Sequence, residues 1–148
     1  MALLGFRFFD ETFQPGYVVQ PHGDHLHKLS RDQQRAELAI RRGHPNGARR
    51  ANAVFVFEAR SVAEALLGKA SGKYLYEVEV GPEDVIHRGD LEIYDEVVEA
   101  LKHGHDADPL IAAFWASVER PSPRMELTVA KVKVRRKLAA ALERAGAP

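Results

Sequence analysis

Residues 49–90 constrain the fold most, because three different sequence patterns follow one another there. AVFVF (residues 53–57) is a continuous apolar run, which predicts a strand buried on both faces. Ser61 and Glu64 have the spacing of a capping box and precede apolar residues at helical intervals, which predicts a helix. In KYLYEVEV (residues 73–80), aromatic and apolar residues occupy every second position, which is typical of an amphipathic strand. We therefore expect strand, capped helix and strand in this segment.

Further helices are predicted on either side of this segment. Ser30 and Gln33 form a capping box for a helix that runs to about residue 42 and has a thin apolar face, so we expect it on the surface. Residues 91–101 carry apolar side chains at helical spacing. Asp108 and Pro109 are typical of a helix start, and the apolar LIAAFWASV that follows predicts a buried helix.

The remaining strands are predicted at the two ends of the chain. LLGFRFF and YVV, separated by a Pro-Gly turn, indicate two short strands near the N-terminus. MELTVAKVKV indicates a late strand whose alternation slips near Ala130, which predicts a β-bulge. Residues 136–148 have the composition of a terminal helix or a frayed tail. Five or six short strands with helices between some of them favour an α+β fold.

Composition excludes several classes of function. With 148 residues, of which 45% are hydrophobic, the chain fits a single domain over residues 1–148. Basic and acidic residues both number 21, so there is no strong nucleic-acid signal. There is no cysteine for a disulfide, a thiolate nucleophile or a cysteine zinc site. We expect no signal peptide and no membrane span, and therefore a cytoplasmic protein or one delivered to a host by a signal-independent route.

Three short motifs together resemble the ADP-ribosyltransferase-like domains. GFRFFDE followed by PGYVV looks like the opening strand of this family and places Arg7 at its first motif position. RRAN before AVFVFE resembles the start of the middle strand, with Arg50 present and Asn52 where members commonly have a serine. RMELTVAKVKV resembles the late strand that carries the glutamate of the family, here Glu126.

The resemblance implies a small sheet that is split into two halves around an NAD cleft, with flanking helices. It implies a bacterial, toxin-like mono-ADP-ribosyltransferase or NAD glycohydrolase, with NAD as a substrate and an unknown macromolecular or small-molecule acceptor. Arg7 would bind the dinucleotide and Glu126 would stabilise the ribosyl cation, because a fixed carboxylate opposes developing positive charge. The residues expected to bind the cofactor are Arg7, Arg50, Asn52, Phe55 and Tyr76.

Structural roles for the same residues stay open. Arg7 can instead pair with Asp10 or Glu11, as strand arginines often do. Glu126 faces away from its apolar neighbours in the strand and can point to water. The absence of the serine favours an alternative function, a non-catalytic protein-binding module on the same fold.

A histidine cluster supports a third hypothesis. His22, His25 and His27 lie within six residues and include Asp24 between them, a set of side chains that can bind zinc or a similar metal. A metal-dependent hydrolase would use these three histidines. The cluster lies in a polar segment beside a proline, where exposed loop histidines without a metal are the simpler interpretation.

Overall fold

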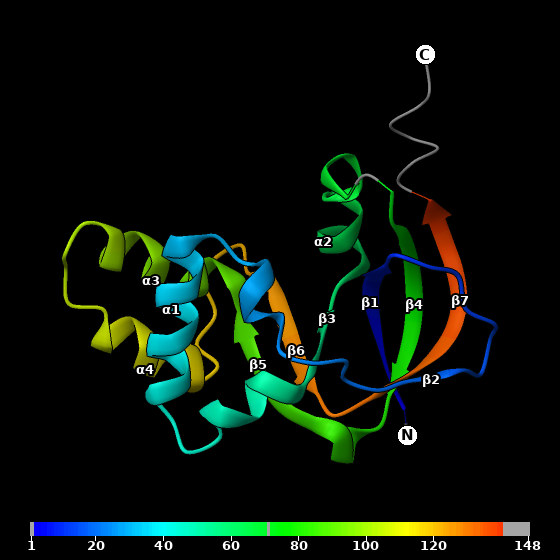
Figure 1. The fold of residues 1–148 in the computed structure, drawn as a ribbon, viewed down its shortest axis with the longest axis horizontal. Coiled ribbons are helices and arrows are strands. Elements are labelled where there is room, and N and C mark those ends of the chain that lie inside the picture. Colours follow the sequence, from blue (N-terminus) through cyan, green and yellow to red (C-terminus); the bar gives the residue numbers. More distant parts are fainter. Residues whose placement is uncertain (1, 71, 141–148) are drawn as a thin grey trace.

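A computed structural model describes residues 2–70 and 72–140. The strands form one antiparallel sheet in the order β2-β7-β4-β1-β3-β6-β5 (Figure 1). Their bounds are β1 Leu3–Phe9, β2 Val18–Val19, β3 Val54–Phe57, β4 Tyr74–Val80, β5 Val85–Asp90, β6 Met125–Val129 and β7 Val132–Ala140. The helices are α1 Arg31–Arg42, α2 Arg60–Glu64, α3 Leu91–Lys102 and α4 Asp108–Trp115. The expected α+β class is therefore confirmed.

The sheet narrows between β1 and β3. β1 pairs with β4 along its whole length, from Leu3 opposite Val80 to Phe9 opposite Tyr74. On its other side β1 pairs with β3 only where Phe6 lies opposite Phe57. The strands β2, β7, β4 and β1 thus form one group and β3, β6 and β5 another, and we call their meeting point the β1–β3 junction.

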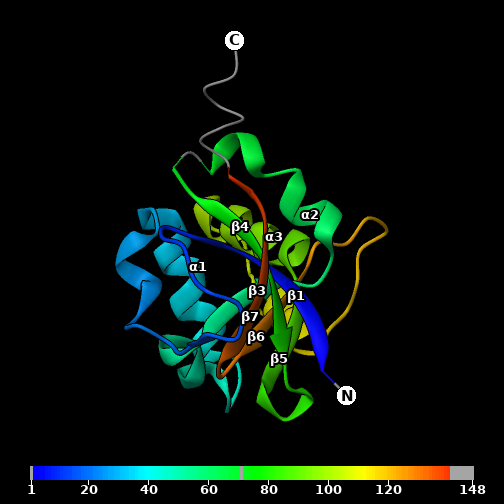
Figure 2. The ribbon, with the colours of Figure 1, turned by 90° about the vertical axis from the view of Figure 1, so that its right-hand side faces the viewer.

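Different segments cover the two faces of the sheet. Figure 2 shows α1 and the segment before it on one side of the sheet and α2 on the other. The main sheet core joins alternate residues of β3, β4, β6 and β7, including Val56, Val78 and Val129. A second core lies among α1, α3 and α4, with Ile40, Ile93 and Phe114 at its centre. Around α2, Ala63 packs with Phe6 and Leu75.

The helix predictions are confirmed in position, with one error in capping. Ser30 accepts from the amide of Gln33 at 3.2 Å, and the Gln33 side chain accepts from the amide of Ser30 at 3.1 Å, as a capping box requires. The second box is wrong, because α2 begins at Arg60 with Ala59 at the N-cap and Ser61 already inside the helix. α4 was expected to be buried, but only one face is: Ile111, Phe114 and Trp115 are buried, whereas Ala112 is exposed. The Trp115 indole donates to the carbonyl of Ile40.

Two predictions for the C-terminal third are wrong. The apolar alternation slips near Ala130 because one strand ends there and another begins, and not because of a β-bulge. β6 pairs with β3 and β5, whereas β7 pairs with β4 and β2. Residues 136–140 continue β7 instead of starting a helix, because they extend the ladder with β4. Residues 141–148 lie outside the described residues. Across residues 2–70 and 72–140, no helix has the length and apolar character needed to cross a membrane.

Candidate functional site

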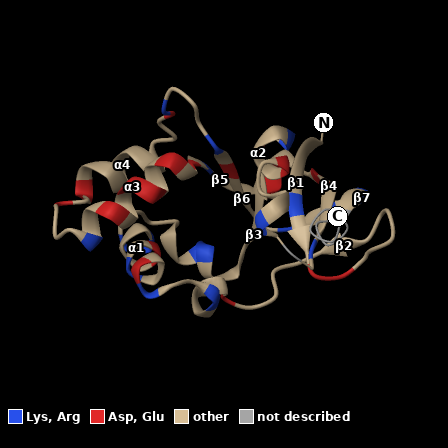
Figure 3. Ribbon diagram, turned by 90° about the horizontal axis from the view of Figure 1, so that it is seen from above, with Lys and Arg blue, Asp and Glu red and all other residues tan. Residues whose placement is uncertain are grey.

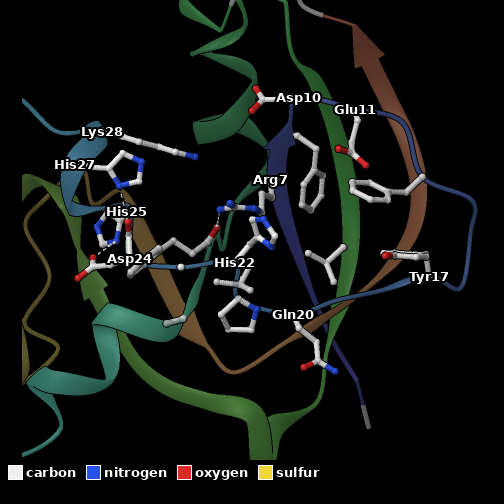
Figure 4. A pocket seen from close by; sticks show the side chains of 18 residues that line it. Arg7, Asp10, Glu11, Tyr17, Gln20, His22, Asp24, His25, His27 and Lys28 are labelled. Carbon is white, nitrogen blue, oxygen red and sulfur yellow. Dashed lines mark hydrogen bonds and ion pairs between the residues drawn. The ribbon is translucent and has the colours of Figure 1, made fainter.

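A pocket of about 400 Å³ lies at the β1–β3 junction, beneath the segment that connects β1 to α1 (Figure 4). β1 contributes Arg7 and Phe9, and β3 contributes Val54 and Phe55. The connecting segment adds aromatic, basic and acidic side chains: Asp10, Glu11, Phe13, Tyr17, His22, Asp24, His25, His27 and Lys28. Residues from both groups of strands therefore meet in one cavity.

Arg7 spans the junction. Its Nη1 atom donates a hydrogen bond of 2.7 Å to the carbonyl oxygen of Phe55, at a point where β1 and β3 no longer pair. Burial lowers the pKa of the Arg7 guanidinium, and the nearby charges of Glu126 and Asp10 oppose that shift. Among the described residues, the buried Nε atom of Arg7 has no hydrogen-bond partner. The principal contact of Arg7 is thus a backbone carbonyl, rather than the surface ion pair that was its structural alternative.

Phe55 contacts three basic side chains, those of His25, Arg50 and Arg7. Its ring lies 4.5 Å from the His25 ring, edge to face, and the Arg50 guanidinium lies 4.9 Å from its centroid. Its carbonyl binds Arg7. Phe55 lines the pocket, and its ring also contacts the buried Arg50.

Glu126 lies on β6, where it is opposite Phe57 on one side and Gly89 on the other. It retains some exposed surface, but burial raises the pKa of its carboxyl, and the positive charges of Arg50, His25 and Arg7 oppose that rise. Glu126 is thus within electrostatic reach of Arg7, although it is not among the residues that line the pocket. On β6 it is on the face opposite Leu127 and Val129, which belong to the main sheet core.

Arg50 has a structural contact that the sequence did not indicate. It belongs to the 3-10 helix η2 (Gly47–Asn52) and is 2% exposed. Its Nε and Nη2 atoms donate to Glu37 at 2.7 and 2.9 Å, and its Nη1 donates to Thr128 at 3.2 Å. Glu37 is fully buried on α1 and also accepts from Arg41 and from the Tyr94 hydroxyl. Burial alone would raise the pKa of Glu37, but its contacts with His25, Arg50 and Arg41 favour the charged form and hold the pKa well below its usual range.

Asn52 and Tyr76, which were also expected to bind the cofactor, lie outside the pocket lining as well. Asn52 is exposed at the end of η2, and its neighbour Ala53 lines the pocket instead. Tyr76 is 2% exposed on β4, where its hydroxyl accepts from the amide of Phe13 and its ring packs against Phe9. Tyr76 supports the pocket wall from behind. Of the five residues expected to bind a cofactor, only Arg7 and Phe55 line the cavity.

The three clustered histidines line the pocket but do not converge on one point. His27 binds the backbone carbonyl of Asp24 through Nδ1 at 2.8 Å, whereas His25 packs against Phe55. Within residues 2–70 and 72–140, no group of three or more histidine, cysteine or acidic side chains is placed to hold a metal ion. The geometry of His22, His25 and His27 therefore gives no support to the metal-hydrolase hypothesis.

The pocket combines basic and aromatic side chains. Arg7, Lys28 and three histidines supply cationic or hydrogen-bonding groups, and four aromatic rings supply stacking surface. Figure 3 shows that both signs of charge occur on the helical side of the molecule and on the sheet side. No protein family model matches the chain, and no curated protein matches it either. The chemistry of the junction pocket must therefore support any functional conclusion.

Proposed function

We propose that the chain is an ADP-ribosyltransferase-like domain that binds NAD in the junction pocket and breaks the bond between nicotinamide and ribose. The ADP-ribose is transferred to an acceptor nucleophile, or to water in a glycohydrolase. One observation carries the proposal: Arg7 links the two groups of strands at the cavity, with Glu126 within electrostatic reach.

The topology supports the family proposal. A sheet split into two halves around the dinucleotide is the arrangement that the family resemblance implies. In this chain one pair of residues, Phe6 and Phe57, joins β1 to β3, and the pocket lies beside that pair. The site residues therefore come from both halves of the sheet.

The side chains of the pocket suit a dinucleotide. A guanidinium has five N–H groups, so Arg7 can bind a pyrophosphate through its remaining donors while it keeps the bond to Phe55. The aromatic rings of Phe9, Phe13, Tyr17 and Phe55 offer surfaces on which adenine or nicotinamide can stack. A cavity of about 400 Å³ lies within the size range of small-molecule sites.

Glu126 has the chemistry required for the bond-breaking step. As the bond from ribose C1′ to the nicotinamide nitrogen breaks, its electron pair leaves with nicotinamide and positive charge develops on the ribose. A poorly hydrated carboxylate stabilises such a charge strongly, because little water screens the interaction. The nucleophile then forms a bond to C1′ and releases its proton. Glu126 is assigned this role because it lies on β6 opposite Phe57 and its charge acts on Arg7 in the pocket.

Nicotinamide release from NAD by the purified protein tests the proposal. Glu126→Gln removes the charge and keeps the size, so we expect release to fall by at least about a hundredfold while NAD binding remains. Glu11→Gln makes the same chemical change at the pocket wall and serves as the matched control. The proposal is wrong if the unaltered protein releases no nicotinamide from NAD, and the role of Glu126 is wrong if Glu126→Gln releases it as fast as the unaltered protein does.

A second candidate is a binding module on the same fold that performs no catalysis. Glu126 does not line the cavity, and Asn52 is exposed at the position where the family commonly has a serine. These two observations favour ligand binding without turnover. In that case NAD or ADP-ribose would raise the melting temperature, no nicotinamide would be released, and Glu126→Gln would leave binding unchanged.

A further inference from the structure

Tyr17 is the most exposed of the aromatic residues that line the junction pocket. Its exposed fraction is 54%, whereas Phe9 is 7% exposed and both Phe13 and Phe55 are half-buried. The ring of Phe55 is also in contact with His25. An aromatic ring gains a favourable free energy when a flat ligand covers its face. Tyr17 therefore offers the largest uncovered stacking surface in the pocket.

Two sets of contacts hold Tyr17 in place. The amide of Gly16 donates to the carbonyl of Val134 on β7, and the amide of Val134 donates to the carbonyl of Tyr17, both at 2.8 Å. The Tyr17 ring stacks on Phe13, with 5.0 Å between the centroids and 22° between the planes. The amide of Phe13 in turn donates to the Tyr76 hydroxyl at 2.9 Å. Because the ring is already ordered, a ligand that stacks on it loses little affinity to conformational entropy.

The order of the strands separates Tyr17 from Glu126. Tyr17 precedes β2 and is bonded to β7, Arg7 lies on β1, and Glu126 lies on β6, in a sheet of order β2-β7-β4-β1-β3-β6-β5. Figure 4 shows the same arrangement within the pocket, with Arg7 between Tyr17 on one side and His27 and Lys28 on the other. Arg7 therefore lies between the exposed ring and the group of strands that carries Glu126.

This arrangement matches the order of groups in a dinucleotide. In NAD the adenine and the nicotinamide are at opposite ends, and the pyrophosphate lies between them. With the pyrophosphate at Arg7 and the nicotinamide ribose towards Glu126, the adenine is directed to the other group of strands, where Tyr17 lies. The reverse orientation would place nicotinamide on Tyr17 and the breaking bond on the side of Arg7 away from Glu126.

We propose that the exposed face of the Tyr17 ring binds the adenine of NAD, so that the dinucleotide crosses the sheet with its adenine towards β2 and its nicotinamide towards β6. The proposal rests on the proposed function, because it concerns the ligand of the same pocket. It assigns a base-binding residue that the sequence motifs did not indicate, and it fixes the direction in which the ligand lies.

Proton NMR of bound NAD tests the orientation directly. The Glu126→Gln protein is used, because it should bind NAD without consuming it. We expect nuclear Overhauser effects between the ring protons of Tyr17 and adenine H2 and H8, and the Tyr17→Phe variant identifies the Tyr17 signals. Effects from Tyr17 to the nicotinamide protons, or none from Tyr17 to adenine while NAD is bound, would overturn the proposal.

Calorimetric titration with ADP-ribose measures the contribution of the ring. Tyr17→Ala should bind about tenfold more weakly, as expected when a stacked base loses its aromatic partner. Tyr17→Phe keeps the ring and should bind like the unaltered protein. Val18→Ala is the matched control, because Val18 is the next residue, is 45% exposed and lies outside the lining of the junction pocket. Thermal melting checks that each variant is folded.

The outcomes separate the role of Tyr17 from the function as a whole. If folded Tyr17→Ala binds ADP-ribose with unchanged affinity, the position of the adenine is wrong and the proposed function stands. If Tyr17→Phe binds as weakly as Tyr17→Ala, the hydroxyl and not the ring face makes the contact, and the stacking proposal is wrong. If neither NAD nor ADP-ribose binds the unaltered protein, the proposed function and the role of Tyr17 are both wrong.

Discussion

The guanidinium of Arg7 donates a 2.7 Å hydrogen bond to the carbonyl oxygen of Phe55, 48 residues away in the chain. This bond joins β1 to β3 where the two strands pair through a single pair of residues. Arg7 therefore stabilises the junction and at the same time lines the pocket.

Replacing Arg7 by lysine should weaken the junction. Lysine keeps the charge but cannot place a donor in the same planar geometry, so we expect a loss of about 1 to 2 kcal/mol in the free energy of unfolding. Urea unfolding measures this change. Arg60→Lys alters an exposed arginine that is 3.5 Å from Glu64, and it should change stability by less than about 0.5 kcal/mol. Equal effects at the two positions would contradict the junction role.

Gly5 keeps β1 and β3 close together. A Cβ atom at this position would lie 2.9 Å from Cγ2 of Val56, which is closer than carbon atoms approach in folded proteins. Gly5→Ala should therefore destabilise the protein by about 1 to 3 kcal/mol through overpacking. Gly68→Ala is the matched control, because no heavy atom lies within 4 Å of its added Cβ. If Gly68→Ala lowers the melting temperature more than Gly5→Ala does, the junction is loosely packed.

Glu37→Gln should be strongly destabilising. The change leaves the buried Arg50 and the partly buried Arg41 without their shared carboxylate, and breaking a buried ion pair costs about 3 to 5 kcal/mol. A double-mutant cycle with Arg50→Met isolates the interaction energy of the pair. Glu64→Gln, at an exposed site, should have little effect in the same unfolding assay. Additive effects of Glu37→Gln and Arg50→Met would contradict the coupling.

His87 should make stability depend on pH. Burial, and then the charge of Arg50, lower the pKa of His87 to about 4 in the folded protein. Its usual value is about 6.5, so between these limits the unfolded chain binds more protons and stability falls as the pH falls. The loss from pH 7.5 to pH 5 should be about 2 kcal/mol.

A leucine at position 87 should remove most of this dependence. Among the described residues neither ring nitrogen of His87 has a hydrogen-bond partner, so the change leaves no partner unsatisfied. Urea unfolding at the two pH values compares His87→Leu with His103→Gln, which alters an exposed histidine. An equally steep pH dependence in the His87→Leu protein would exclude burial of His87 as its cause.

Local sequence patterns predicted much of the fold, because interactions between residues that are close in the chain determine where many helices and strands form. The alternation in residues 73–80 correctly predicted β4, and the Ser30–Gln33 capping box correctly predicted the start of α1. The helix-forming composition of residues 136–140 led to a wrong prediction, because pairing with β4 overrides intrinsic propensity. Ser61 failed as a cap because α2 starts one residue before it.

The site was harder to predict, because its contacts join residues distant in sequence. Arg7 and Phe55 were expected in the site and both line the pocket. Glu37 was missed, since a glutamate in a helix is normally exposed and its partners Arg50 and Tyr94 lie 13 and 57 residues away. Its one local signal was Arg41, four residues later on the same helix face. His25 was singled out only as a metal ligand, because a sequence does not reveal that a ring packs on Phe55.

Calorimetric titration of NAD into the unaltered protein and into Arg7→Ala at pH 7 tests the assignment of the junction pocket most directly. We predict binding to the unaltered protein with a Kd below about 1 mM, the upper end of common substrate affinities. Arg7→Ala should bind at least about tenfold more weakly while it remains folded, and Arg60→Ala should bind normally. Absence of NAD binding at millimolar concentrations, or equal binding by folded Arg7→Ala, would contradict an NAD site at this junction.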